Sequence, residues 1–296
     1  MDDPPLTRLG VGELDRAELL AARPTPIGTP DLWPLLERAR RQLLDGMGRA
    51  EPCLDWPDPA PGHDYLYAWA LLSVLGPVRD FHASRGVPDA VSWATLADLG
   101  RQLARGRVLL GHGGLATPGW LSTHFRGDLY ELGRLQFQRT RIPAHRVRTV
   151  FPDASTDLAA LDVHIPATGP LTPQACDDAF ARAAGFFARH FPEDGHRYAV
   201  CTSWLLDPQL TGYLPADSNI IGFQQRFQPV PDDEPSADDA GDDGAVLDLV
   251  FDRRRAPAHR AELDALPRDT TLQRAIVGHL RAGRHWHFRT GWCSLG

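Results

Sequence analysis

A turn with the sequence Ala-Thr-Gly-Pro-Leu-Thr, residues 167–172, lies between a short apolar segment and a long segment of helical periodicity. The first amides of a helix have no helical partner and carry about half a unit of positive charge, which suits a phosphate. Gly169 lets the backbone approach such a group closely. The turn matches neither a Walker nor a dinucleotide-binding fingerprint, so by itself it is only a general signal for anion binding.

Thiol, hydroxyl and imidazole groups supply further candidates. Cys201 and Ser203 are two residues apart in a predicted strand and therefore lie on one face, where Cys201 could be a nucleophile or simply a core residue. His285 and His287 alternate on another predicted strand without a third ligand nearby, so we expect no metal site. The four cysteines show no CxxC spacing, a pattern typical of reduced thiols in the cytosol.

The basic residues exclude two kinds of chemistry. The sequence contains 31 lysine and arginine residues together, and every one of them is arginine. Without lysine, neither Schiff-base catalysis nor a P-loop lysine is possible. Three arginines, Arg134, Arg139 and Arg141, flank a predicted hairpin, where one of them could bind an acceptor carboxylate or all could be solvated.

The net charge of −7 comes from one segment. Residues 231–244 hold seven acids and no base, and we predict that they form a solvated surface loop. The remaining acids and bases balance, which argues against nucleic acid as a partner. The acidic start of the chain and the lack of a long apolar segment predict a cytoplasmic protein without membrane contact.

The pattern of apolar residues changes along the chain. Residues 1–124 predict helices joined by loops rich in proline and glycine, and residues 125–296 alternate strands with helices, so the expected fold class is α/β (α+β). The segment 129–141 predicts a hairpin with a turn at Gly133. Further strands are expected at 161–165, 198–206, 245–251 and 286–293, and helices at 172–190, 217–227 and 271–282.

This order of elements resembles the GNAT acyltransferases. Several segments resemble, more narrowly, two-domain proteins that join a helical N-acyltransferase N-terminal domain to a GNAT-like C-terminal domain. The resemblance extends over most of the chain and implies a helical domain packed on a mixed β-sheet. The segments that carry it include Leu161-Asp-Val-His-Ile-Pro, Cys201-Thr-Ser-Trp-Leu-Leu-Asp-Pro-Gln-Leu, Leu266-Pro-Arg-Asp-Thr-Thr-Leu-Gln-Arg and Trp120-Leu-Ser-Thr-His-Phe-Arg-Gly.

The resemblance implies a site for coenzyme A. In that fold the strand at 161–165 leads into a turn whose amides hold the CoA diphosphate, and the strand at 198–206 diverges to admit the pantetheine arm. The family's usual Arg/Gln-x-x-Gly-x-Gly/Ala turn is absent here, and Pro170 lacks an N–H. The implied cofactor contacts are Ile165, Thr168, Gly169, Leu171, Thr172 and Asn219.

The resemblance also implies catalytic roles. His164, at the end of the 161–165 strand, would be the general base, or else a histidine hydrogen-bonded within the sheet. His124 is a second candidate for the base. Cys201 or Ser203 would protonate the departing CoA thiolate, with Tyr213 as an alternative acid.

The expected function is therefore direct transfer of an acyl group from acyl-CoA to an amine or hydroxyl of a small-molecule acceptor. Two alternatives stay open at this point. One is a thioesterase that uses Cys201, and the other is a GNAT-like module that binds acyl-CoA or a partner without catalysis. A Gly-x-Ser-x-Gly nucleophile elbow is absent from the sequence.

Overall fold

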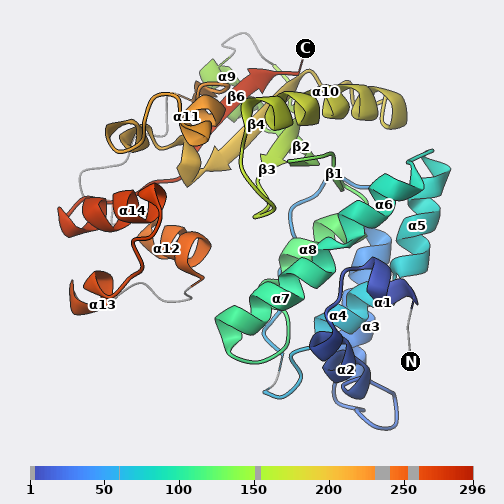
Figure 1. Cartoon of the computed structure of the whole chain (residues 1–296). Helices are drawn as coiled ribbons and strands as arrows, with labels where there is room; N and C mark the ends of the chain where they lie inside the picture. The colour runs from blue at the N-terminus through green and yellow to red at the C-terminus, as the bar shows by residue number, and fades with distance from the viewer. Residues whose placement is uncertain (1–3, 60, 151–154, 231–240, 253–259, 296) are drawn as a thin grey trace. The chain divides into compact units, whose positions relative to one another are not determined.

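The computed structural model describes residues 4–59, 61–150, 155–230, 241–252 and 260–295 (Figure 1). The chain divides into two compact units, Met1–Glu131 and Leu132–Gly296. The domain boundary at 124/125 stays a prediction, a few residues before this division. Among the described residues, no helix combines the length and apolar character that crossing a bilayer requires.

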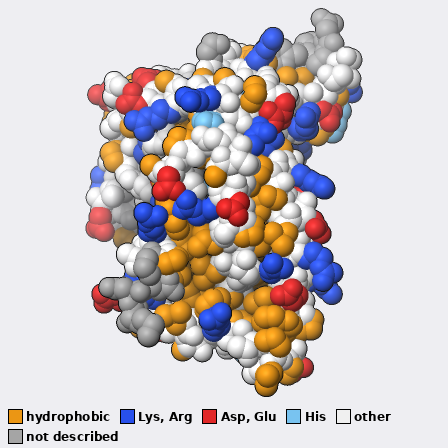
Figure 2. All heavy atoms as spheres, turned by 90° about the vertical axis from the view of Figure 1, so that its right-hand side faces the viewer, with side chains coloured by type: hydrophobic (Ala, Val, Ile, Leu, Met, Phe, Trp, Pro, Cys, Tyr) orange, Lys and Arg blue, Asp and Glu red, His pale blue; other side chains and the backbone are white. Residues whose placement is uncertain are grey.

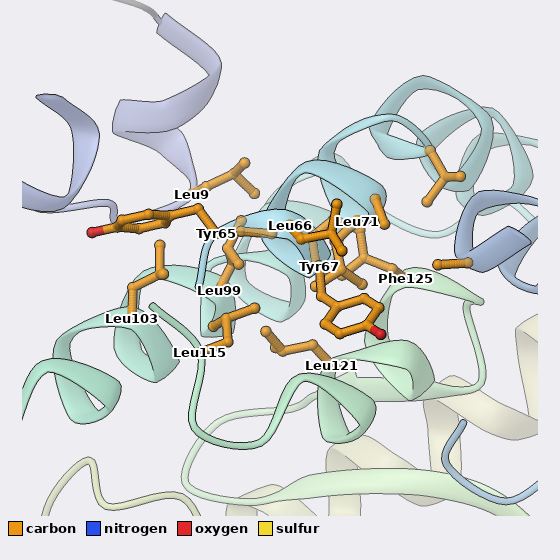
Figure 3. Close-up of a cluster of buried hydrophobic side chains, with 14 of the residues drawn as sticks. Leu9, Tyr65, Leu66, Tyr67, Leu71, Leu99, Leu103, Leu115, Leu121 and Phe125 are labelled. Carbon is orange, nitrogen blue, oxygen red and sulfur yellow. The ribbon is translucent and has the colours of Figure 1, made fainter. Parts of the chain in front are cut away.

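The first unit is helical, as the sequence predicts. Its core is one cluster of buried leucine and aromatic side chains from several helices, of which Figure 3 labels ten. Burying each such side chain contributes about 1.5–3 kcal/mol, so this cluster is the main source of the unit's stability. The elements are α1 (Pro4–Arg8), α2 (Glu13–Ala21), α3 (Trp33–Asp45), α4 (Leu66–Leu72), α5 (Leu75–Ser84), α6 (Asp89–Leu96), α7 (Asp98–Leu110), α8 (Pro118–Phe125) and β1 (Leu129–Glu131).

The second unit is built on a mixed sheet with the strand order β2-β3-β4-β6-β5. The strands β2 and β3 are antiparallel, β3 and β4 are parallel, and β6 is antiparallel to both β4 and β5. The strands are β2 (Gln136–Ile142), β3 (Leu158–His164), β4 (Tyr198–Ser203), β5 (Gln228–Pro229) and β6 (Arg289–Ser294). The helices are α9 (Ala144–Val150), α10 (Pro173–His190), α11 (Asn219–Gln224), α12 (Asp243–Phe251), α13 (Arg260–Asp264) and α14 (Thr271–Arg281), with 3-10 turns η1 (Trp204–Leu206) and η2 (Pro208–Gly212).

Helix α10 lies along one face of this sheet (Figure 1). Phe180 of the helix meets Phe137 of β2 edge to face, with 5.4 Å between ring centroids. The predicted cap is confirmed, because the Thr172 hydroxyl accepts the N–H of Ala175 and a proline follows it in the first turn. The predicted hairpin with its turn at Gly133 and the predicted helices at 172–190, 217–227 and 271–282 are also present.

The two central strands diverge after a short paired segment. Pairing between β3 and β4 runs from Ala160 and Tyr198 to Asp162 and Val200. Beyond it, β3 continues to His164 against β2, and β4 continues to Ser203 against β6. Strand β3 stays paired with β2, and β4 stays paired with β6, after the pairing of β3 with β4 ends. The sheet therefore opens between β3 and β4.

One predicted strand is wrong. Residues 245–251 form part of helix α12. Val246 and Leu247 are buried and Val250 is partly buried, which is the spacing of one helical face. A short apolar run has no periodicity that separates a strand from a buried helix, and the sequence alone did not decide between them.

The end of the predicted acidic loop is at the surface, as predicted, but its carboxylates also make structural hydrogen bonds. The Asp242 carboxylate accepts the N–H of Phe288 at 2.8 Å, and the Asp243 carboxylate accepts the N–H of Trp286 at 2.8 Å. These bonds tie the start of α12 to the segment before β6. Residues 231–240 of the predicted loop lie outside the described residues.

The surface of the described residues mixes charges of both signs. On the face in Figure 2, arginine and acidic side chains are interspersed among hydrophobic ones. This mixture agrees with the balanced charge predicted for most of the chain and does not form a basic stripe on that face.

Candidate functional site

Arg134 holds the turn between β3 and α10 through three carbonyls. Its guanidinium donates to the carbonyl oxygens of Pro166 at 2.9 Å, Gly169 at 2.7 Å and Pro170 at 3.2 Å. These bonds fix the shape of the turn and place a positive charge beside it.

This role of Arg134 is not the one predicted from the sequence, which was carboxylate binding or surface solvation. The signal that could have revealed it is the register of the sheet. Gln136 pairs with His164, so Arg134 comes opposite Pro166. Register between strands depends on long-range pairing, which residue spacing alone does not give.

The turn itself is open at Gly169. Its φ of +134° is a conformation that favours glycine, and a Cβ there would meet nothing within 4 Å. The Thr168 N–H donates to the Pro166 carbonyl at 2.8 Å, within the turn. The Thr168 amide is therefore already hydrogen-bonded. The amides of Gly169, Leu171 and Thr172 stay candidates for contact with the diphosphate. Ile165, also predicted to contact the cofactor, is partly buried just before the turn.

His164 lies at the end of β3, beside the opening of the sheet, with 23% of its side chain exposed. Its Nε2 is 3.1 Å from Oε1 of Gln138 on β2 and 3.8 Å from Oδ2 of Asp162. In the tautomer in which Nε2–H donates to the Gln138 amide oxygen, Nδ1 carries the lone pair that a general base needs. The position therefore suits proton removal at the opening.

Asp162 shares this face of the sheet with His164, because the two residues are two apart on β3. Burial raises the pKa of the Asp162 carboxyl to about 7, although the N–H of Val163 opposes the shift by donating to it. A third of the side chain still faces a cavity. Sequence reasoning missed Asp162, and the Asp-x-His spacing in a predicted strand is the signal that could have found it.

The cavity lies against the same face of the sheet and has a volume of ≈ 450 Å³. Asp162 of β3 forms part of its wall, and most of the other lining residues come from β2, β4, β6 and α9. The lining is mixed, with aliphatic and aromatic groups beside hydroxyls and cations. Among these residues are Thr140, Arg141, His145, Arg146, Val147, Tyr198, Val200, Thr202 and Trp292.

Cys201 and Ser203 lie on the opposite face. Val200 pairs with Asp162 and lines the cavity, so the next residue, Cys201, points to the other side. Cys201 is fully buried, and burial raises the pKa of its thiol well above the usual value. The Ser203 hydroxyl accepts the N–H of Leu205 and caps the 3-10 turn after β4. The structure does not bring these two side chains together with His164.

The remaining predicted contacts are tied to other parts of the second unit. Asn219 is exposed at the start of α11, where the Ser218 hydroxyl accepts the Ile221 N–H at 3.3 Å. The Tyr213 hydroxyl is 2.9 Å from Nδ1 of His279, whose Nε2 is 3.1 Å from the His285 carbonyl. Tyr213 therefore belongs to a structural hydrogen-bond chain.

His124, the second candidate base, is buried in the first unit. Its Nε2 is 3.3 Å from Oδ2 of Asp98, which also accepts the indole N–H of Trp120 at 3.2 Å. Burial favours a higher pKa for Asp98, but His124 and Arg101 outweigh it, so the pKa of that carboxyl is lowered. His124 is fully buried, so it lacks the exposure that a base needs to reach an acceptor in this structure.

Two of the three arginines near the hairpin have structural surroundings. Arg134 holds the turn, and the buried Arg139 donates to Asp194 at 2.6 Å and stacks over Phe191. Arg141 lines the cavity. His285 contacts Asp243 at 2.7 Å, and the described residues contain no group of three or more side chains suited to hold a metal ion.

Comparisons with known proteins agree with this geometry. Residues 3–127 match the family described as N-acyltransferase N-terminal domain, and residues 129–293 match the GNAT-like C-terminal domain. The chain is similar to a solved acyltransferase in complex with decanoyl-CoA and teicoplanin, with 40% identity over 98% of this chain and 86% of that chain and a TM-score of 0.85. A variant of an acyltransferase in complex with octanoyl-CoA is 40% identical over the same shares, with a TM-score of 0.87. None of the curated proteins compared is similar enough to count as a match.

Proposed function

We propose that this protein transfers an acyl group from acyl-CoA directly to an amine. The chain belongs to the acyltransferases that join an N-acyltransferase N-terminal domain to a GNAT-like C-terminal domain. The solved relatives bind octanoyl-CoA and decanoyl-CoA, so a medium-length acyl chain is the first donor to test. One relative is in complex with the glycopeptide teicoplanin, which makes an amine on a molecule of that class the first acceptor to test.

The observation that carries this proposal is the opening between β3 and β4. Strand edges that have lost their neighbour present backbone N–H and C=O groups, which an extended amide-containing chain satisfies by pairing. The pantetheine arm of CoA is such a chain. The turn held by Arg134 lies at the end of the opening, where the amides of Gly169, Leu171 and Thr172 and the start of α10 would hold the diphosphate.

In this proposal His164 removes the proton from the acceptor amine. The imidazole lies where β3 borders the opening, on the same face of the sheet as Asp162, which lines the cavity. Direct transfer needs no covalent acyl-enzyme. The buried Cys201 thiol, with its raised pKa, is poorly suited to be a nucleophile because the thiolate is the reactive form. This supports direct transfer over the Cys201-dependent thioesterase.

A melting experiment with a ligand series tests the proposal. We expect CoA, octanoyl-CoA and decanoyl-CoA to raise the melting temperature, since ligand at about 100 times its Kd adds ~2.7 kcal/mol of stability. Arg134→Ala should weaken CoA binding, because the turn loses three hydrogen bonds. Arg182→Ala, which removes an exposed arginine of α10, is the matched control and should bind normally.

Catalysis is then measured by release of free CoA in the presence of an amine acceptor. No melting shift with any CoA compound at millimolar concentration would remove the donor assignment. Binding without acceptor-dependent CoA release, across amine and glycopeptide acceptors, would instead favour the non-catalytic module.

A further inference from the structure

Asp162 is a partly buried acid whose role direct acyl transfer does not by itself explain. Its Oδ2 lies 3.8 Å from Nε2 of His164, on the same face of the same strand. Among the described residues, His164 is the basic side chain that the structure places in ion-pair range of Asp162. Gln138 faces both, since it pairs with Asp162 across the sheet and contacts the His164 ring.

We propose that Asp162 is the exit for the catalytic proton: Nδ1 of His164 takes the proton from the acceptor, Nε2 passes its own proton to Asp162, and water in the cavity carries that proton away. Exchange of the ring proton with water then restores the Nε2–H tautomer for the next turnover. The proposal rests on the function proposed above. Asp162 acts through His164 and does not contact the reacting carbon, so its role is to position the imidazole and accept its proton.

The reaction itself requires such an exit. An amine enters as an ammonium ion, its nitrogen forms a bond to the thioester carbon, and the bond from that carbon to sulfur breaks. The nitrogen loses two protons to become an amide N–H. One neutralises the departing thiolate, and the other must leave for solvent in every turnover. The imidazole must also return to its neutral form before the next turnover. A group that removes its proton makes this regeneration faster.

The cavity gives this proton a path. Asp162 lines it, whereas the Gln138 side chain that also contacts His164 is nearly buried. Thr140, Thr202 and Tyr198 line the same space and carry hydroxyls, which are groups that water can bridge. The route therefore runs from the imidazole through the carboxyl to a cavity of ≈ 450 Å³.

The charged groups around Asp162 allow it to change its protonation. Arg141 of β2 and Arg146 and His145 of α9 line the cavity, and the Cys201 thiol lies on the far face of the neighbouring strand. A cation within ion-pair distance would hold the Asp162 carboxyl ionised, and none of these cations is that close. Burial raises the pKa of Asp162 to about 7, so it both takes up and releases protons near neutral pH.

The first test follows the His164 resonances by NMR in the full-length protein, with His164→Ala used for assignment. In Asp162→Asn, which keeps the shape and removes the ionisable carboxyl, His164 should titrate at lower pH than in the wild type, because the imidazolium loses the carboxylate 3.8 Å from its Nε2. An unchanged titration would overturn the pairing. This measurement needs no turnover, so it stands apart from the proposed function.

The second test measures turnover across pH. Asp162→Asn should lower kcat by about 10-fold or more, leave the KM for acyl-CoA unchanged and move the acidic limb of the profile to lower pH. Asp162→Ala should regain activity when formate is added, because the small acid reaches the vacated position from the cavity, and chloride should not replace it. Wild-type kcat in Asp162→Asn, or an Ala variant that formate does not restore, would refute the proton exit. A wild-type enzyme without any acyl transfer would instead refute the proposed function.

Discussion

On one face of the sheet, Asp162 and His164 lie beside Gln138 and are partly exposed, and Asp162 lines a cavity. On the other face, Cys201 is fully buried and Phe137 packs against α10. The two sets come from neighbouring strands of one sheet, and on β2 the adjacent residues Phe137 and Gln138 face opposite sides. The comparison teaches that a nucleophile-like residue type alone does not give a side chain access to solvent or a titratable neighbour, and the face that has both is the one on which we propose the reaction.

The largest expected effect comes from the open face. His164→Ala should lower turnover by roughly 10²–10⁴-fold while CoA affinity stays nearly the same, because a general base acts on the transition state. The acidic limb of the rate profile should disappear with it. Rates of CoA release and CoA titrations measure both quantities. A variant with wild-type turnover would mean that His164 is only a hydrogen-bonded residue of the sheet.

A second prediction compares two neighbours on β2 that face opposite sides. Phe137→Ala should destabilise the protein by about 3–5 kcal/mol, since it opens a cavity against α10. Gln138→Ala should cost only about 1 kcal/mol but should lower turnover, because His164 loses a hydrogen-bond partner. Chemical denaturation and CoA release measure the pair. Equal losses of stability would contradict the difference between the faces.

A third prediction concerns stability and pH. Burial raises the pKa of Asp162 from 3.8 to about 7, so the folded state keeps a proton that the unfolded state has released. Stability from this group is full below about pH 4 and is lost as pH rises through 7. Asp162→Asn should therefore melt at a higher temperature than the wild type at about pH 8, with a smaller difference at about pH 5. If Asp162→Asn instead melted at a lower temperature than the wild type at about pH 8, the ionised carboxylate would stabilise the fold.

The smallest effect is expected on the packed face. Cys201→Ser should keep turnover within a few-fold of the wild type, since direct transfer forms no bond to this residue, although the buried hydroxyl costs about 1–3 kcal/mol of stability. Intact mass after exposure to octanoyl-CoA should show no acyl adduct. An inactive serine variant, together with an adduct on the wild type, would support a covalent mechanism instead.

Local signals predicted much of this arrangement. The hairpin around Gly133, the cap of α10 by Thr172 and the strand that carries His164 each follow from residues close together in sequence. The same reasoning failed for α12, where a short apolar run had no decisive period. Two features could not be predicted: the hydrogen bonds from Arg134 to the turn, and the placement of His164 and Cys201 on opposite faces of the sheet. Both depend on register between distant strands.

Hydrogen–deuterium exchange with and without octanoyl-CoA tests the central claim, that the donor binds in the opening between β3 and β4. Peptides that cover residues 163–172 and 200–203 should exchange more slowly with ligand, because their amides gain partners along the opening and at the turn. Peptides from the core of the first unit, such as those around Leu66 and Leu71, serve as the reference. Slower exchange at 163–172 is the result that we predict. Unchanged exchange there, at a ligand concentration that raises the melting temperature, would place the donor elsewhere and contradict the account.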